Sequence, residues 1–144
     1  MYTIVDLQEK AKNDLAKIGV DLEKMQSEHR VAFTSDRRWP STAYMHLFIQ
    51  NGIIHVNFYG DRGGLEEELQ TTDIDDALYH VYSDRIFNMA STYAVKTCRP
   101  GEDDRRYLFA KELELFRMID EKYYLRAKKE IEETLKQSPY HDER

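Results

Sequence analysis

The sequence has 144 residues, of which 41% are hydrophobic and 33% are charged, and its formal net charge is −6. No apolar run approaches the roughly 20 residues of a membrane helix, and the acidic balance argues against direct binding to nucleic-acid phosphates. The single cysteine, Cys98, excludes an internal disulfide and a cysteine-based zinc site. We therefore expect one domain over residues 1–144, in the cytoplasm, without membrane attachment, metal or other cofactor.

The N-terminal part of the chain predicts a helix followed by a strand. Thr3 and Asp6 have the spacing of a capping box, and Gly19 predicts the end of the helix. Residues 30–34 are β-prone and predict a first strand. The apolar stripe of the helix repeats at three- and four-residue steps and consists of Ile4, Leu7, Ala11, Leu15, Ile18 and Leu22.

A β-hairpin over residues 44–59 is the best-specified element. Asn51-Gly52 lies between two β-prone runs and predicts a two-residue type I′ turn, which fixes the register. One face is then apolar and consists of Met45, Leu47, Ile49, Ile54, Val56 and Phe58. The other face mixes aromatic and polar residues, namely Tyr44, His46, Phe48, Gln50, Ile53, His55, Asn57 and Tyr59, and we expect it to face away from the core.

After the hairpin, residues 65–70 predict a further strand, with Glu66, Glu68 and Gln70 on the aromatic-polar face. Thr72 then predicts the cap of a long helix that ends near Thr97. Two more helices follow, one from about Glu102 and one that Ser138-Pro139 ends. The prediction is an α+β fold: an N-terminal helix, a small antiparallel meander of three or four strands around the Asn51-Gly52 hairpin, and about three C-terminal helices.

The charge is concentrated between the hairpin and the long helix. Residues 61–76, here called the acidic segment, hold seven acidic residues and one arginine, so the rest of the chain is balanced. A solvated loop and helix start would explain this, but an acidic patch also suits a basic partner. The predicted partner-binding surface combines the aromatic-polar face with these acids: Tyr44, His46, Phe48, His55, Tyr59, Asp61, Glu66, Glu68, Asp73, Asp75 and Asp76.

The C-terminal half contains an ordered series of short motifs. They are Met89-Ala90 and Tyr93, then Gly101, Asp103, Arg105-Arg106 and Phe109, and finally Pro139-Tyr140-His141-Asp142. This order resembles the immunity protein 63 family of bacterial immunity proteins, over a little under half of the chain. Two positions depart from the family pattern, with Cys98 in place of a histidine and Tyr140 in place of a phenylalanine.

The resemblance implies a protein that neutralises a cognate toxin domain of a polymorphic-toxin or contact-dependent inhibition system. Such toxins include many nucleases, so we expect a basic nuclease as partner, an RNase as the first choice. The motif residues also suggest a structural brace: Asp103 precedes a helix, and at least one of Arg105 and Arg106 in its first turn requires a specific acceptor, such as an acid on the preceding helix.

Two other classes of function remain open from the sequence. His46 and His55 project from the same hairpin face and could form the acid–base pair of a small hydrolase or nuclease. A constitutive adaptor subunit would have the same composition as an immunity protein. The outer edge of the sheet also leaves pairing of two copies open.

Overall fold

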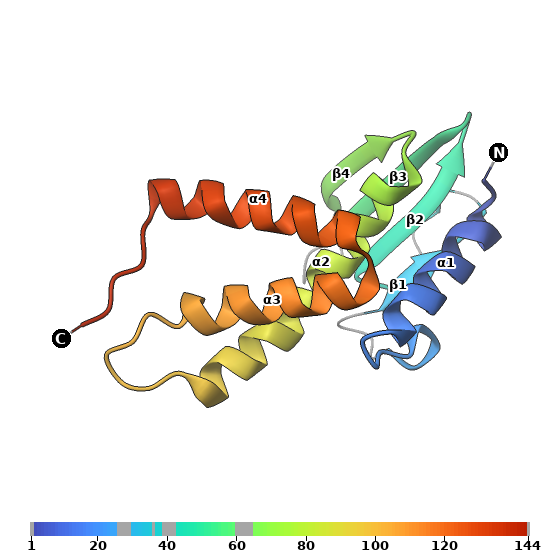
Figure 1. Ribbon diagram of the computed structural model, residues 1–144. Coiled ribbons are helices and arrows are strands. Elements are labelled where there is room, and N and C mark those ends of the chain that lie inside the picture. The colour runs from blue at the N-terminus through green and yellow to red at the C-terminus, as the bar shows by residue number, and fades with distance from the viewer. Residues whose placement is uncertain (1, 26–29, 36, 39–42, 60–64, 144) are drawn as a thin grey trace. The chain divides into compact units, whose positions relative to one another are not determined.

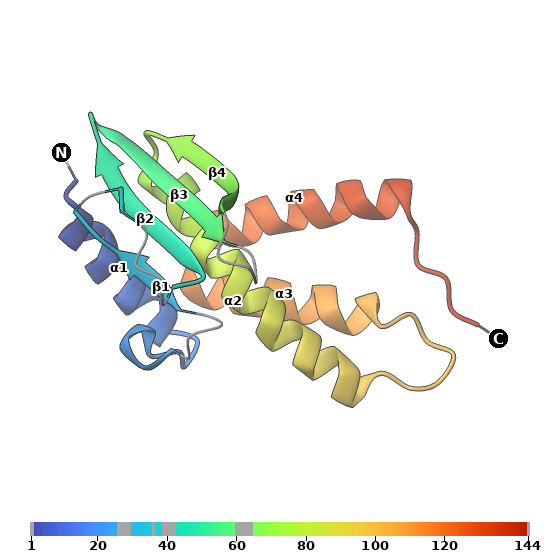
Figure 2. The same cartoon turned by 180° about the vertical axis from the view of Figure 1, so that it is seen from behind.

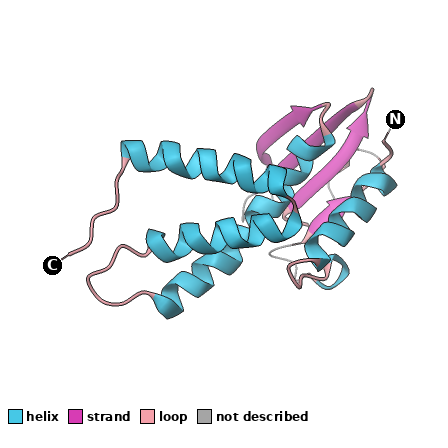
Figure 3. Ribbon diagram, viewed as in Figure 1, coloured by secondary structure: helices cyan, strands magenta, loops and turns pink. Residues whose placement is uncertain are grey.

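The computed structural model describes residues 2–143 apart from 26–29, 36, 39–42 and 60–64, and it leaves the Glu66 side chain undescribed. The described chain divides into two compact units, Met1–Tyr82 and Ser83–Arg144, and the division falls within one helix. The elements, in chain order (Figures 1 and 3), are α1 (Ile4–Ala16), the 3₁₀ helix η1 (Leu22–Lys24), β1 (Val31–Phe33), β2 (Met45–Gln50), β3 (Ile53–Tyr59), β4 (Leu65–Thr71), α2 (Ile74–Thr97), α3 (Arg105–Ile119) and α4 (Glu121–Gln137).

The first unit contains a sheet with the strand order β1-β2-β3-β4. Strands β2, β3 and β4 pair antiparallel, as predicted, but β1 pairs in parallel with β2, so the sheet is mixed. The connection over residues 34–44 is long enough to return the chain to the starting end of β1, which a short hairpin loop cannot do. The α+β class, the N-terminal helix and the C-terminal helices are confirmed.

The turn between β2 and β3 has the predicted geometry. Asn51 and Gly52 have φ values of 53° and 75°, the positive values that a type I′ turn requires at both central positions. The register is also confirmed, because Gln50 pairs with Ile53, Phe48 with His55 and His46 with Asn57. The turn therefore sorts the side chains of the two strands onto the faces that the sequence predicts.

Helix α1 and the beginning of α2 lie on the same side of the sheet (Figures 1 and 2). The capping box of α1 is confirmed: Thr3 Oγ1 accepts a hydrogen bond from the Asp6 amide (3.2 Å), and Asp6 Oδ2 accepts one from the Thr3 amide (2.9 Å). The core of this unit joins the helices to the apolar face of the hairpin, and its fully buried residues include Leu7, Leu15, Met45, Leu47, Val56 and Leu78.

The second unit contains the end of α2 and the helices α3 and α4. Helix α3 begins at Arg105, three residues later than the sequence suggests. Gly101, in the loop before it, has a φ of 86°, a left-handed value that glycine adopts easily. Asp120 caps α4 by accepting from the Lys122 amide (3.0 Å). None of the helices in the described ranges combines the length and the apolar character that crossing a membrane requires.

Candidate partner-binding surfaces

The aromatic-polar face of the hairpin is not the exposed surface that the sequence suggests. His46 and Phe48 are 0% and 2% exposed, and His55 and Tyr59 are each 8% exposed, whereas Tyr44 is half-buried. The expectation that this face projects into solvent is therefore wrong for these four side chains. Their part in partner binding stays a prediction, and it would have to be indirect in this conformation.

The burial of this face has a local physical cause. The Phe48 ring stacks on the His55 imidazole across β2 and β3, with 4.5 Å between centroids and 5° between planes, and it also contacts the His46 ring at 5.2 Å. Aromatic neighbours on paired strands cover one another in this way. One nitrogen of each imidazole has a hydrogen-bond partner on the same face: His46 Nε2 lies 2.5 Å from Thr34 Oγ1, and His55 Nδ1 lies 2.8 Å from Glu68 Oε1.

The two histidines are therefore engaged separately. Phe48 contacts both rings, and each imidazole hydrogen-bonds to a different residue on a different neighbouring segment. An acid–base pair needs both groups within reach of one transferred proton. The enzymatic alternative gains no support from this arrangement.

The described part of the acidic segment lies on β4 and at the start of α2. Asp73, and not Thr72, caps this helix: its Oδ1 atom accepts from the Asp75 amide at 2.9 Å, and its carbonyl accepts from the Ala77 amide. Asp76 lies 3.6 Å from His80 Nε2, one turn along the helix. Acidic groups here are favoured by the positive end of the helix dipole. Asp61 and the side chain of Glu66 lie outside the described residues.

Glu68 connects the acidic segment with the buried face. Its carboxylate accepts hydrogen bonds from His55 Nδ1 and from Gln70 Nε2 (2.9 Å), and the bond with His55, more than that with Gln70, lowers the pKa of Glu68. Its side chain nevertheless remains accessible beside exposed Glu67. The strand thus presents Glu67 and Glu68 to solvent, and the Glu68 carboxylate also holds the His55 imidazole.

A second cluster, in the second unit, joins the two parts of the C-terminal motif series. Arg105 Nη2 donates to Asp103 Oδ2 (2.8 Å) and to the Pro139 carbonyl (2.9 Å), and Nη1 donates to the Ser138 carbonyl (2.9 Å). Asp103 also accepts from the His141 amide at 3.2 Å. The Arg105 guanidinium, more than any other neighbour, holds the pKa of Asp103 far below its ordinary value.

Arg106 makes the second connection between the α2–α3 loop and the C-terminal tail. Its Nη2 atom lies 2.9 Å from Asp142 Oδ2, and the other oxygen of Asp142 accepts from the Asp103 amide at 2.7 Å. The Arg106 guanidinium also lies over the ring of Tyr140, 4.4 Å from its centroid. We call the contacts between residues 99–106 and 138–143 the tail brace.

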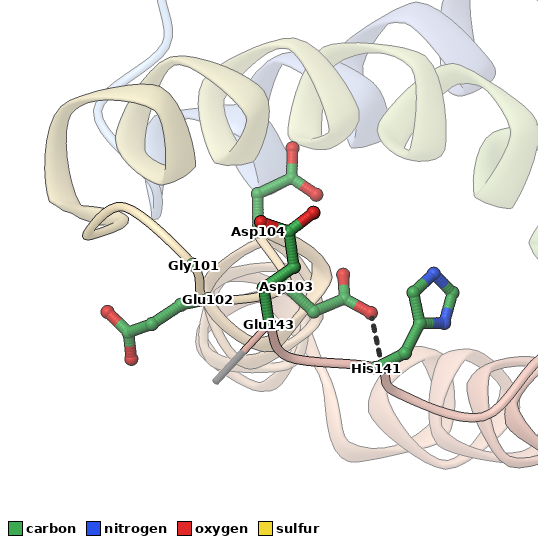
Figure 4. A pocket seen from close by; sticks show the side chains of 6 residues that line it. All are labelled: Gly101, Glu102, Asp103, Asp104, His141 and Glu143. Atoms are coloured by element: carbon green, nitrogen blue, oxygen red, sulfur yellow. Dashed lines mark hydrogen bonds between the residues drawn. The ribbon is translucent and has the colours of Figure 1, made fainter.

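The tail brace closes over Gly101. The Glu143 amide donates to the Gly101 carbonyl at 2.6 Å, and a Cβ atom at position 101 would lie 3.0 Å from the Glu143 carbonyl oxygen. A hollow of about 450 Å³ remains between loop and tail, lined by Gly101, Glu102, Asp103, Asp104, His141 and Glu143 (Figure 4). The two motif blocks are therefore parts of one structural connection.

Two of the acids that line this hollow, Glu102 and Asp103, have hydrogen-bond partners close by. Asp103 is bonded to Arg105 and the tail, and Glu102 accepts from the Tyr107 hydroxyl at 2.8 Å and points away from His141 (Figure 4). Within the described ranges, no group of three or more His, Cys, Asp or Glu side chains has the arrangement of a metal site. The prediction of a brace was right, but the acceptors lie in the loop and tail and not on the preceding helix.

The remaining motif residues lie on the helices of the same unit. Phe109 contacts the Tyr140 ring, with 6.2 Å between centroids, and so extends the brace onto α3. Tyr93 on α2 is partly exposed, and Lys111 Nζ lies 4.9 Å from its ring centroid. Met89 is half-buried on the same helix. These contacts are structural, and none of them places a reactive group in a cavity.

Sequence reasoning missed a buried polar centre in the first unit. Asp14 on α1 is 5% exposed and is held by Lys10 Nζ (2.9 Å), Lys17 Nζ (3.2 Å) and the Tyr82 hydroxyl. Burial would raise the pKa of Asp14, but the hydrogen bond from Tyr82 and those from the two lysines outweigh it and lower the pKa. The two lysines, four residues before and three after Asp14, were the signal available in the sequence.

Comparison with known families gives a match over residues 52–133, from the hairpin turn through most of α4, to the family described as Immunity protein 63. Separate comparisons with curated proteins and with solved structures give no match. The matched range includes Gly101, Asp103 and the two arginines of the tail brace. The match covers more than half of the chain, and the protein belongs to the Immunity protein 63 family.

Proposed function

We propose that this protein binds a cognate bacterial toxin domain directly and neutralises it. The observation that carries the proposal is the family match over residues 52–133. An inhibitor of this kind needs a stable surface complementary to its partner and no catalytic group of its own. The separate engagement of His46 and His55 is consistent with such a role.

The partner that best fits the charge is a basic toxin domain, and we propose a nuclease, with an RNase as the first choice. Nucleases bind phosphates through clustered Lys and Arg. A surface with ionised Glu68, exposed Glu67 and exposed Asp73 complements such a cleft electrostatically and would speed association. The inhibitor would then act by covering the active or substrate-binding surface of the toxin.

The proposed contact surface is narrower than the sequence suggests. We assign direct contact to Tyr44 and to the acids of β4 and the start of α2, which are Glu66, Glu68, Asp73, Asp75 and Asp76, and we extend it to Asp61. His46, Phe48, His55 and Tyr59 support this surface from beneath. The whole chain, residues 1–144, would act as one functional unit in the cytoplasm, in a polymorphic-toxin or contact-dependent inhibition system of bacterial competition.

Co-expression tests this function. The toxin domain encoded immediately upstream of this chain should arrest growth alone, and co-expression of the wild-type chain should restore growth and give a complex that purifies as one species. Leu47→Asp, which places a charge at a fully buried position, is the matched unfolded control and should not rescue. Continued arrest despite abundant soluble wild-type protein would contradict the proposal. An adaptor subunit would carry out its role whether or not a toxin gene lies beside its own gene.

A further inference from the structure

Strand β4 is the outer strand of the sheet in the first unit, and among the described residues no strand lies beside one of its long edges (Figures 1 and 2). The other edge pairs with β3 from Ile54–Thr71 to Tyr59–Leu65. An outer strand carries a row of main-chain N–H and C=O groups that point away from the sheet and can pair with another extended segment. The register of the hairpin decides which residues of β4 supply them.

Along β3, the main-chain hydrogen bonds go alternately to β2 and to β4, and the turn shows which residues bond to which strand. Gln50 and Ile53 flank the two-residue turn and form a hydrogen-bonded pair. Such pairs recur at every second residue, and the Tyr59 amide accordingly donates to the Tyr44 carbonyl at 3.0 Å. The main-chain N–H and C=O groups of the odd-numbered residues of β3 therefore point toward β2, and those of Ile54, Val56 and Phe58 point toward β4.

The same alternation applies to β4. Its residues opposite Ile54, Val56 and Phe58 are Thr71, Leu69 and Glu67, and their main-chain groups bond to β3. The N–H and C=O groups of Glu68 and Gln70 then point outward. Within the described residues, no main-chain hydrogen bond outside the ladder involves these two positions. Glu68 and Gln70 thus offer two donors and two acceptors at the two-residue spacing of a strand.

The side chains along this edge determine which kind of strand fits it. Glu67 and Glu68 project to opposite faces of β4, and both are accessible; Asp73 follows just beyond the strand. A second copy of β4 would place carboxylates beside carboxylates, which is unfavourable on paired strands. A strand with Lys or Arg residues would place opposite charges there and would satisfy the same main-chain groups.

We propose that β4 is the docking edge of this protein and that its occupant is an extended, basic segment of the toxin, which adds to the sheet beside Glu68 and Gln70. This assignment rests on the proposed toxin-binding function and specifies how the partner is held. Main-chain hydrogen bonds supply the attachment, and the carboxylates on the two faces of β4 select a cationic strand.

A pair of substitutions at Gln70 isolates the main-chain contribution. Gln70→Pro removes the outward N–H, and it leaves the ladder with β3 intact because that N–H does not point to β3. Gln70→Ala keeps the N–H and is the matched control, since both changes remove the side-chain bond to Glu68. With the toxin domain encoded upstream as the probe, Gln70→Pro should bind about tenfold more weakly than Gln70→Ala.

Amide hydrogen exchange of the wild-type chain gives a second readout that needs no variant. In the unbound protein, the amides of Leu69 and Thr71 should exchange slowly and those of Glu68 and Gln70 quickly. In the toxin complex, the amides of Glu68 and Gln70 should also become slow. Protection of all four amides in the complex, together with the weak binding of Gln70→Pro, is the expected result.

The outcomes that would overturn the proposal are distinct. A stable complex in which Glu68 and Gln70 exchange as in the unbound protein would refute the docking edge and leave the neutralising function intact. Protection of these amides in a dimer of the chain alone would identify a second copy as the occupant. The absence of any complex and of any rescue would refute the proposed function and, with it, this assignment.

Discussion

The hydroxyl of Tyr82 donates a hydrogen bond to the Asp14 carboxylate at 2.5 Å, and both side chains are buried. The bond joins α2 to α1 within the first unit. Bonds to charged groups contribute more than neutral ones, so Tyr82→Phe should lower the free energy of unfolding by about 1.5–3 kcal/mol. Urea unfolding measures this change. Tyr2→Phe, at an exposed position, is the control and should have almost no effect; equal losses for the two variants would contradict the prediction.

Glu112 on α3 should make stability depend on pH near neutrality. Burial, and then the charge of Glu130 on α4, raise the pKa of Glu112 from 4.5 to about 7. Between these values the unfolded chain is ionised at this position while the folded chain holds the proton. Stability therefore falls as the pH rises through this window.

The isosteric change Glu112→Gln removes this titration. At pH 8 it should raise the free energy of unfolding by about 1–2 kcal/mol, a value reduced from the full shift because the site is only half-buried. Below pH 4.5 the difference between variant and wild type should vanish. Denaturant unfolding at both pH values measures it. Exposed Glu133→Gln is the control, and an equal gain there would refute the assignment to burial.

The tail brace should respond to the charge of Asp142. Asp142→Asn weakens the bond to Arg106, so the His141 and Glu143 amides, which bond to Asp103 and Gly101, should exchange faster. Amide exchange followed by NMR measures this release, and the α3 core around Leu115 should be unaffected. Asp104→Asn changes a neighbouring acid whose side chain makes no capping bond, and it should leave the tail amides unchanged.

Acid should have the same effect on the brace as Asp142→Asn. The bond from Arg106, followed by that from the Asp103 amide, lowers the pKa of Asp142 from 3.8, so this carboxylate takes up a proton more readily when the tail is released. The contribution of the brace is therefore complete above about pH 4 and is lost as the pH falls through the lowered value. Tail resonances that stay unchanged throughout an acid titration would contradict this mechanism.

Charge at the outer strand should control the rate of toxin binding. Glu67→Lys reverses an exposed charge on β4 and should lower the association rate constant by about 3- to 10-fold at low salt, with little change in dissociation. Added salt should reduce the difference. Glu132→Lys makes the same change in net charge at an exposed position of α4 and should leave the rate near that of wild type. Stopped-flow kinetics over a salt series distinguish local from global charge effects.

Local sequence was sufficient where one short segment determines the geometry. Asn51 and Gly52 fixed the turn, and the turn fixed every pairing of β2 with β3, because a strand alternates with a period of two. The capping box of Thr3 and Asp6 was equally local. The continuation onto β4 was also predictable for Glu68 and Gln70, which face Asn57 and His55 as expected.

The features that could not be predicted from the sequence depend on contacts between residues that are distant in the chain. The aromatic-polar face looked exposed because polar residues alternate with apolar ones, but Phe48 contacts both imidazoles, and Thr34 and Glu68 each hydrogen-bond one of them. The parallel pairing of β1 depends on a connection that has no periodic pattern. Arg105 has one acceptor nearby in Asp103, but its carbonyl acceptors and the Asp142 acceptor of Arg106 lie more than 30 residues away in the tail, beyond the reach of helix periodicity.

The tail brace also imposes a rule on how this sequence can change over evolutionary time. Arg106 and Asp142 satisfy each other, so the loss of either leaves an unmatched charge, and the two positions should vary together among related chains. Position 101 should keep glycine wherever the tail crosses it, because a side chain there would meet the Glu143 carbonyl oxygen. A lineage that discards the tail is therefore expected to lose the second arginine and the glycine as well, in correlated steps.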